Sequence, residues 1–233
     1  MVTLPNVEAI LERQARLWEM RRRMDQQGGA GESVKQRESG GPWITVSRQL
    51  GSGGTELAQR LGVELGWEVY DREILETIAS HTHTRQAVLS RLDERAVGPM
   101  IEYIRRLLDP EIPGQTDFLQ EMLRVIWGLA RKGNAIIVGR GANWFLDPRS
   151  GLRLRVVAPF DVRAARVARD DKRVRQNDER QSGFVHKVFG EDIDDPLGYD
   201  LVINTGAVDL SSAVRAAIAA LRPRVPVVAR TCG

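Results

Sequence analysis

The sequence has little that could form a disulfide, cross a membrane or direct secretion. Cys232 is its only cysteine, so no intrachain disulfide can form and a reducing compartment is expected. No run of about 18 apolar residues occurs, which argues against a membrane-spanning helix. The N-terminus also lacks the charged start, short apolar core and small-residue cleavage site of a secretory signal. We therefore expect a cytoplasmic protein with no membrane partner.

Aromatic residues are also scarce, at 6% of the 233 residues, whereas 42% are hydrophobic and 28% are charged. This composition is ordinary for a globular domain that is large enough to bury a core. The net charge of +3 is a mild basic excess, which fits either nucleic acid or a small polyphosphate ligand. Because no aromatic surface is evident on which bases could stack, nucleic acid is the weaker alternative.

The chain divides into four segments. Residues 1–24 contain a predicted helix, whose apolar stripe is a candidate contact for a homo-oligomer. Residues 25–42 are rich in glycine, serine and charge, and we interpret them as a flexible linker. A folded domain is expected over residues 43–223, followed by a C-terminal tail over residues 224–233.

Short apolar strands alternate with predicted helices in the folded domain. The strand-like segments are WITV, WEVY, AIIVG, LRLRVVA and DLVINT. Residues 81–133 hold no convincing strand, so we expect a helical insertion there. This alternation predicts a three-layer α/β fold, in which a parallel sheet carries helices on both faces. Ligands of such sheets bind beyond the carboxyl ends of the strands.

A glycine-rich loop, SRQLGSGGT, follows the first of these strands. Gly51, Gly53 and Gly54 let the backbone approach an anion closely, and the N–H groups of the following helix would face it. Thr55 lies where the phosphate-loop pattern G-x-x-x-x-G-K-[ST] places a hydroxyl for Mg²⁺. Arg48, however, stands at the first glycine position of that pattern and Gly54 at the lysine position.

Two other interpretations of this loop stay open. A glycine-rich turn from strand to helix needs no ligand at all. A dinucleotide-binding fingerprint, G-x-G-x-x-G, would use Asp71 as its acid, but Glu56 stands where its third glycine belongs. His81 and His83 are metal-ligand residue types without a cysteine or a third histidine nearby, and we interpret them as loop histidines.

Arginines occur at two further places of interest. Arg140 lies between two glycines directly after the strand AIIV, where a loop can present it to a phosphate. Residues 163–180 belong to a predicted long basic helix, on which Arg166, Arg169 and Arg173 share one face. A solvated surface position is the simpler interpretation for any one of them, but together such arginines could neutralise a transferring phosphoryl group.

Five segments in this order resemble the cytidylate kinase-like family, relatives of the bacterial P-loop nucleoside monophosphate kinases. The segments are ITVSRQLGSGGTELAQRLG, VYDREIL, IIVGRGANW, the basic helix and DDPLGYDLVINT. The resemblance covers Ile44 to Leu221. It implies a P-loop NTPase-type fold with a helical acceptor-binding insertion at 81–133 and a lid at 163–190.

The resemblance also implies roles for individual residues. An ATP-phosphate loop would comprise Gly51, Ser52, Gly53, Gly54 and Thr55, with Thr55 as a ligand of Mg²⁺. An acceptor nucleotide would contact Tyr70, Asp71 and Arg140, and the lid would contribute Arg166, Arg169 and Arg173 to catalysis.

The sequence departs from the family pattern in its charges. Gly54 stands where the family has a lysine, and Val138 and Gly141 stand where it has carboxylates on either side of the glycine–arginine pair. These departures leave open whether the chain turns over substrate. They also leave open which acceptor it would use.

We predict that the loop charge has moved to Arg48. Its guanidinium would meet the β- or γ-phosphate of ATP, and Gly54 would leave room for it. The competing interpretation is that Arg48 pairs with Asp71 and only shapes the turn. The sequence thus indicates an ATP- and Mg²⁺-dependent phosphotransferase that acts on a nucleoside monophosphate, such as CMP, or on a related small acceptor. The alternative is a nucleotide-binding regulatory protein that keeps the fold without turnover.

Overall fold

The computed structural model describes residues 41–80 and 115–221. The predicted N-terminal helix, nearly all of the linker, most of the insertion and the C-terminal tail lie outside these residues. The described strands are β1 (Trp43–Arg48), β2 (Glu68–Tyr70), β3 (Ala135–Val138), β4 (Gly151–Val157) and β5 (Leu201–Asn204). The described helices are α2 (Gly54–Leu65), α3 (Arg72–Ser80), α6 (Gln115–Lys132), α7 (Ala142–Phe145), α8 (Phe160–Arg166), α9 (Asp171–Phe189), the 3-10 helix η2 (Pro196–Gly198) and α10 (Leu210–Leu221). None of these helices has the length and apolar character that a membrane span requires.

The described strands form one parallel sheet in the order β2-β3-β1-β4-β5. The predicted parallel sheet is therefore confirmed. β1 lies at its centre, paired with β3 on one side and with β4 along its whole length on the other. The glycine-rich loop after β1 consequently leaves the middle of the carboxyl edge, where ligands of open α/β sheets bind.

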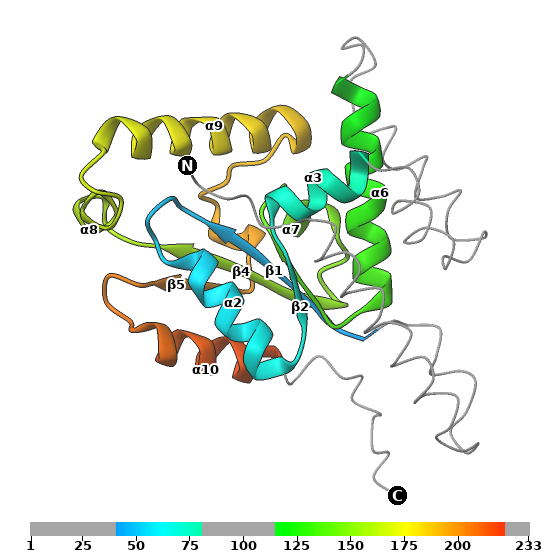
Figure 1. Ribbon diagram of the computed structural model, residues 1–233, viewed down its shortest axis with the longest axis horizontal. Helices are drawn as coiled ribbons and strands as arrows, with labels where there is room; N and C mark the ends of the chain where they lie inside the picture. Colours follow the sequence, from blue (N-terminus) through cyan, green and yellow to red (C-terminus); the bar gives the residue numbers. More distant parts are fainter. Residues whose placement is uncertain (1–40, 81–114, 222–233) are drawn as a thin grey trace, which may run out of the picture. The chain divides into compact units, whose positions relative to one another are not determined.

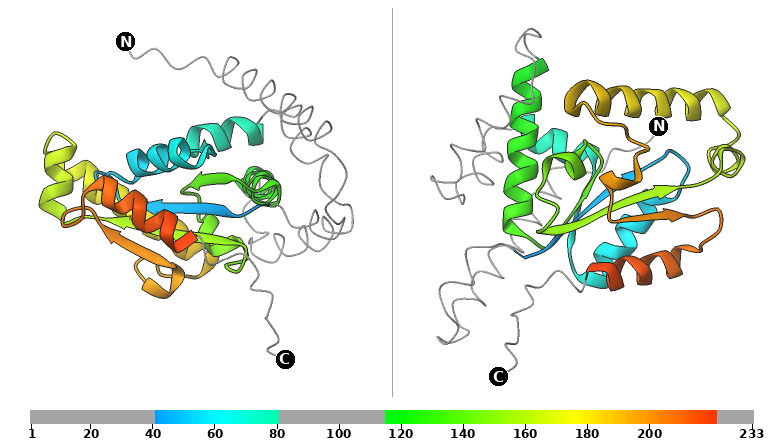
Figure 2. Two further views of the ribbon diagram at one scale, coloured as in Figure 1. Left: turned by 90° about the horizontal axis from the view of Figure 1, so that it is seen from below. Right: turned by 180° about the vertical axis from the view of Figure 1, so that it is seen from behind.

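Helices cover both faces of the sheet (Figures 1 and 2). Alternate strand residues such as Ile44 and Val46 form one core with Leu57 of α2 and Ala213 of α10. The strand residues between them point to the opposite face, because side chains alternate along a strand. Helices α6 and α7 pack against β3 and β1 on that face. The central strands are apolar on both faces, and the helices that cover both faces produce the predicted three layers.

The predicted single basic helix is wrong, because the chain breaks between α8 and α9 (Figure 1). Ala168 and Arg169 adopt left-handed backbone conformations, with φ of 58° and 59°, which end a right-handed helix. Asp170 then caps α9 by accepting a hydrogen bond of 2.9 Å from the N–H of Arg173. Arg166, Arg169 and Arg173 therefore do not share a helix face.

Candidate functional site

The glycine-rich loop between β1 and α2 turns through two left-handed glycines. Gly51 has a φ of 80° and Gly53 a φ of 76°, a backbone conformation that residues with a Cβ rarely adopt. A Cβ at position 51 would also lie 2.5 Å from the carbonyl oxygen of Arg163 in α8. Glycine at position 51 is therefore required both by the turn and by the close approach of α8.

The carbonyl groups of residues 50–52 bind donors from two other parts of the fold. Arg163 donates to the carbonyl of Leu50 at 3.4 Å, and Arg166 donates to the carbonyl of Gly51 at 3.3 Å. The hydroxyl of Thr205 donates to the carbonyl of Ser52. The backbone N–H groups of residues 53–54, in contrast, form no hydrogen bond with a described residue. With its carbonyls bound in this way, the loop presents donors at the N-terminus of α2, the arrangement that binds phosphate.

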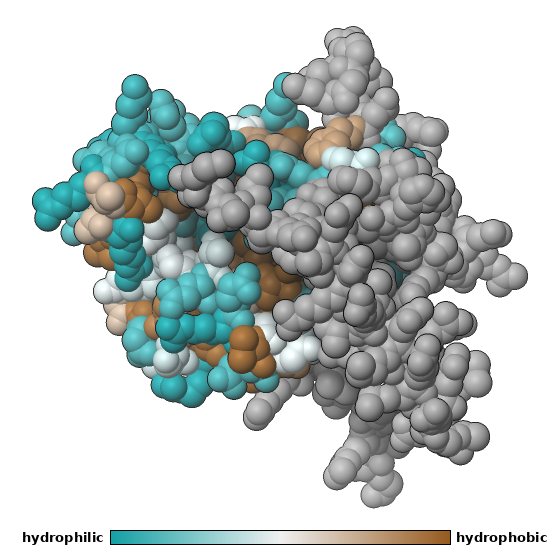
Figure 3. Space-filling view, viewed as in Figure 1, coloured by the Kyte–Doolittle hydropathy of each residue, from teal (hydrophilic) through white to brown (hydrophobic). Residues whose placement is uncertain are grey.

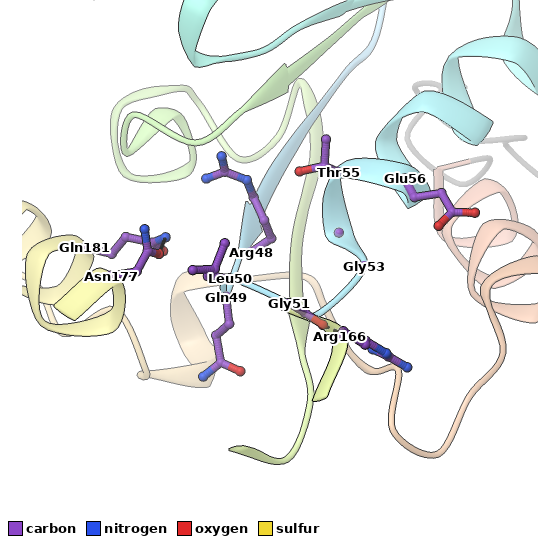
Figure 4. Close-up of a pocket in the computed structure, with 11 residues that line it drawn as sticks. Arg48, Gln49, Leu50, Gly51, Gly53, Thr55, Glu56, Arg166, Asn177 and Gln181 are labelled. Carbon is purple, nitrogen blue, oxygen red and sulfur yellow. Dashed lines mark hydrogen bonds between the residues drawn. The ribbon is translucent and has the colours of Figure 1, made fainter. Parts of the chain in front are cut away.

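A cleft of about 520 Å³ lies beside this loop. Arg48 and Thr55 lie on one side of it, and Asn177 and Gln181 of α9 lie on the other (Figure 4). The Thr55 oxygen points towards Arg48 in the same view. The space-filling view shows hydrophilic surface over α9 along the top of this face (Figure 3). A cleft lined in this way fits a polar, anionic ligand better than an apolar one.

Arg48 occupies the space that Gly54 leaves open. A Cβ at position 54 would lie 2.4 Å from Cβ and 3.1 Å from Cγ of Arg48. A side chain at position 54 would therefore require Arg48 or the backbone to move, and the prediction that Gly54 makes room for Arg48 is confirmed. The guanidinium extends to the next loop, where a Cβ at Gly139 would lie 3.1 Å from Nη1 of Arg48. Arg48 thus reaches from the glycine-rich loop to the loop that carries Arg140.

The Arg48 guanidinium forms no hydrogen bond or ion pair with another described residue. Asp71, its predicted alternative partner, instead caps α3 by accepting a hydrogen bond of 3.1 Å from the N–H of Ile74. Burial lowers the pKa of Arg48; the charge of Asp71 raises it, and the charges of Arg72 and Arg155 lower it further. A partly buried guanidinium whose N–H groups are not bonded to other described residues is well suited to bind an anionic ligand.

Arg140 lies in the loop between β3 and α7. Its φ of 58° places it in the left-handed region, between two glycines that are also left-handed. Its guanidinium pairs with Glu76 of α3, whose carboxylate also accepts a hydrogen bond of 3.0 Å from Nε of Arg72. Burial, and then the charges of Arg72 and Arg48, lower the pKa of Arg140 to about 10. Three arginines therefore lie near one another at this part of the carboxyl edge.

Several predicted site residues are not available to a ligand in the cleft. Arg166 lines it, but its guanidinium is bound to the loop carbonyl and to Thr205. Arg169 and Arg173 are exposed and do not line the cleft. The Tyr70 side chain is only 1% exposed, with its hydroxyl bonded within β2. Ser52 is fully buried, and its hydroxyl donates to a carbonyl of its own loop at 2.8 Å, so its side chain shapes the loop.

Two features of the site were not predicted from the sequence. Arg163 is buried and binds both carboxylate oxygens of Asp178, at 3.0 and 2.9 Å, which joins α8 to α9. This pair crosses the helix break, so no helical spacing could indicate it. Asn177 and Gln181 also went unnoticed, because two amides within a strongly charged stretch give no pattern.

Thr55 is a described residue that fits a Mg²⁺ ion bound together with a polyphosphate. Mg²⁺ keeps several waters and usually takes one or two protein oxygens in addition to substrate phosphates. Thr55 is exposed in the first turn of α2, and its hydroxyl faces the cleft (Figure 4). Within residues 41–80 and 115–221, no cluster of three or more His, Cys, Asp or Glu side chains could hold a metal. A Mg²⁺ ion at Thr55 would share its coordination with the phosphates of the ligand.

The cytidylate kinase-like family matches residues 43–207. The chain belongs to this family. A cytidylate kinase from Methanothrix thermoacetophila is 30% identical to the chain over 189 residues, which cover 77% of this chain and 97% of that protein. A cytidylate kinase from Pyrococcus horikoshii is 29% identical over 172 residues, which cover 70% and 79% respectively.

The solved structures agree with this membership at the level of fold. The crystal structure of an uncharacterized protein from Eubacterium ventriosum matches with a TM-score of 0.59 at 24% identity, covering 76% of this chain and 96% of that one. Together with the parallel five-stranded sheet, the family match confirms the predicted α/β kinase fold.

The contact between positions 48 and 54 predicts the effect of restoring the family's lysine. We expect Gly54→Lys to lower stability by about 1–3 kcal/mol, because the new side chain collides with Arg48, and to weaken ATP binding as Arg48 is displaced. Thermal melting and ATP titration measure the two effects. Gly183→Lys is the matched control, since a Cβ at Gly183 of α9 would meet nothing within 4 Å. Tighter ATP binding by Gly54→Lys at unchanged stability would contradict the prediction.

Proposed function

We propose that the protein is an ATP- and Mg²⁺-dependent phosphotransferase that moves the γ-phosphoryl group to a nucleoside monophosphate, with CMP as the first candidate acceptor. The observation that carries this proposal is the placement of Arg48, which has no hydrogen-bond or ion-pair partner among the described residues and lies over the glycine-rich loop in the space left by Gly54. The family membership supports the reaction class. The relatives named cytidylate kinase support CMP as acceptor.

The reaction needs positioning and neutralisation of charge more than covalent chemistry. The free N–H groups at the start of α2 would hold the ATP phosphates, and Thr55 would hold Mg²⁺. When bound, that ion would neutralise phosphate charge. Arg140 would hold the phosphate of the acceptor. Arg48 reaches from one loop to the other, so its guanidinium would contact the phosphoryl group as it passes between donor and acceptor.

A second candidate function is nucleotide binding in a regulatory role without turnover. The side of α9 that faces the loop offers the amides of Asn177 and Gln181 rather than cations. Arg163 and Arg166 are already bound to carboxylate, hydroxyl or carbonyl oxygens. A site with few available cations would bind ATP while stabilising the transition state weakly.

A panel of nucleoside monophosphates separates the two candidates. The full chain is mixed with ATP, Mg²⁺ and CMP, UMP, AMP, GMP or dCMP, and ADP release is measured. We expect release above the ATP-only background with CMP. ATP binding without release for any acceptor would support the regulatory function.

Arg48→Ala is expected to weaken ATP binding in the presence of Mg²⁺ by about 2 kcal/mol, or roughly thirtyfold, because the site loses a charge-assisted contact. The thermal midpoint should stay close to that of the parent chain. Arg60→Ala is the control, since Arg60 is exposed and pairs with Glu56 on the surface of α2. If Arg48→Ala destabilises the protein and spares ATP affinity, the role of Arg48 is structural.

Arg140→Ala is expected to act on the acceptor alone. Loss of a bidentate contact worth about 1.5–3 kcal/mol should lower kcat/KM for CMP at least about tenfold, with little change in ATP affinity. Steady-state kinetics with either substrate varied measures both effects. Arg149→Ala is the control, since Arg149 is exposed and pairs with Asp147 on the surface. If kcat/KM for CMP and the affinity for ATP fall equally, or if neither changes, Arg140 does not bind the acceptor.

A further inference from the structure

Glu76 forms an ion pair with the guanidinium of Arg140, the group that would bind the phosphate of the proposed acceptor. Glu76 lies on α3, outside the motifs that characterise the loops, and its side chain is 32% exposed. Its carboxylate pairs with Arg140 and also accepts a hydrogen bond from Arg72. One carboxylate therefore serves two arginines at the place where the proposed acceptor would bind.

Among the described residues, the arginines around Glu76 carry more positive charge than the neighbouring carboxylates balance. Besides burial, the charges of Arg72 and Arg48 lower the pKa of Arg140, and the charge of Arg72 lowers the pKa of Arg48. Asp71, a second described carboxylate near these arginines, is engaged as the cap of α3. Partly buried cations of one sign are unfavourable unless an anion compensates them. Glu76 supplies one negative charge, whereas a phosphate monoester dianion supplies two and offers three oxygens.

The hydrogen bonding of Arg140 is incomplete as well. Its Nε is buried and has no hydrogen-bond partner within the described part of the chain. Its left-handed backbone is a strained conformation for a residue with a side chain, a type of strain that clusters at ligand-binding sites. A pair that served the fold alone would not require Arg140 to be held by a strained loop with one donor unsatisfied. These features indicate a guanidinium held ready for a larger anion.

We propose that Glu76 is a specificity-determining residue, which occupies the acceptor clamp at Arg140 and Arg72 and yields it only to a phosphate monoester dianion. A neutral nucleoside or a weakly charged anion does not displace the carboxylate, so the clamp discriminates by charge before the base is recognised. This inference rests on the proposed function, because it assumes that Arg140 faces the acceptor. The pairing of Glu76 with the arginines lowers the apparent affinity for the acceptor, because only molecules in which the carboxylate has left Arg140 bind the ligand.

The test compares the full chain with Glu76→Gln, which keeps the shape of the side chain and removes its charge. CMP, cytidine and inorganic phosphate are titrated by calorimetry. We expect CMP and phosphate to bind about fivefold or more tightly to the variant, because the competing carboxylate is gone, and cytidine to bind as it does to the parent chain. Glu73→Gln removes the same charge from an exposed position on the same helix and should change none of the three affinities.

Unchanged or weaker CMP binding by a folded Glu76→Gln variant would overturn the inference, as would a variant that binds neither CMP nor phosphate. If Glu76→Gln does not fold, Glu76→Asp keeps the charge and withdraws it by one methylene, and the same gain in CMP affinity is required. ADP release is measured in parallel. A gain in CMP affinity without ADP release from parent or variant would leave the role of Glu76 standing and refute the phosphotransferase.

Discussion

Positions 48 and 54 cannot both carry a side chain in this backbone, and the arrangement of the site follows from that steric limit. In the phosphate-loop pattern, a glycine stands at the place of position 48 and a lysine at the place of position 54. Here the two are exchanged, with Arg48 extending across Gly54. Because the arginine starts from the strand rather than from the helix, its guanidinium reaches past the glycine-rich loop to the loop of Arg140. One residue thereby connects the two loops that border the carboxyl edge.

The conformation of the glycine-rich loop depends on groups outside it. Its carbonyls are bound by two arginines and a threonine from beyond β4, which leaves the N–H groups at the start of α2 available. The same arginines are thereby taken out of the cleft. The cations of α8 thus set the backbone geometry of the loop, whereas free arginines in a lid would neutralise phosphate. Positive charge at the carboxyl edge is carried by Arg48 and by the group around Arg140.

The sequence allowed the sheet, the loop and the exchange of Arg48 with Gly54 to be predicted, because short apolar strands between helices and the spacing of glycines are local properties. The break between α8 and α9 could not be predicted, since Ala168 and Arg169 adopt left-handed conformations without the glycine or proline that would mark a turn. The ion pair between Arg140 and Glu76 was also missed. It joins two elements that are distant in sequence, and such contacts follow from packing alone.

The ion pair between Arg163 and Asp178 also sets how this domain opens locally. Separating α9 from α8 would leave a buried guanidinium without its carboxylate, which is strongly unfavourable. Because Arg163 also binds the carbonyl of Leu50, we expect the first turns of α9 and the glycine-rich loop to unfold as one cooperative unit. Amide protons in that half of α9 should therefore exchange with solvent in step with those of the loop, and an anion bound at the loop would slow both.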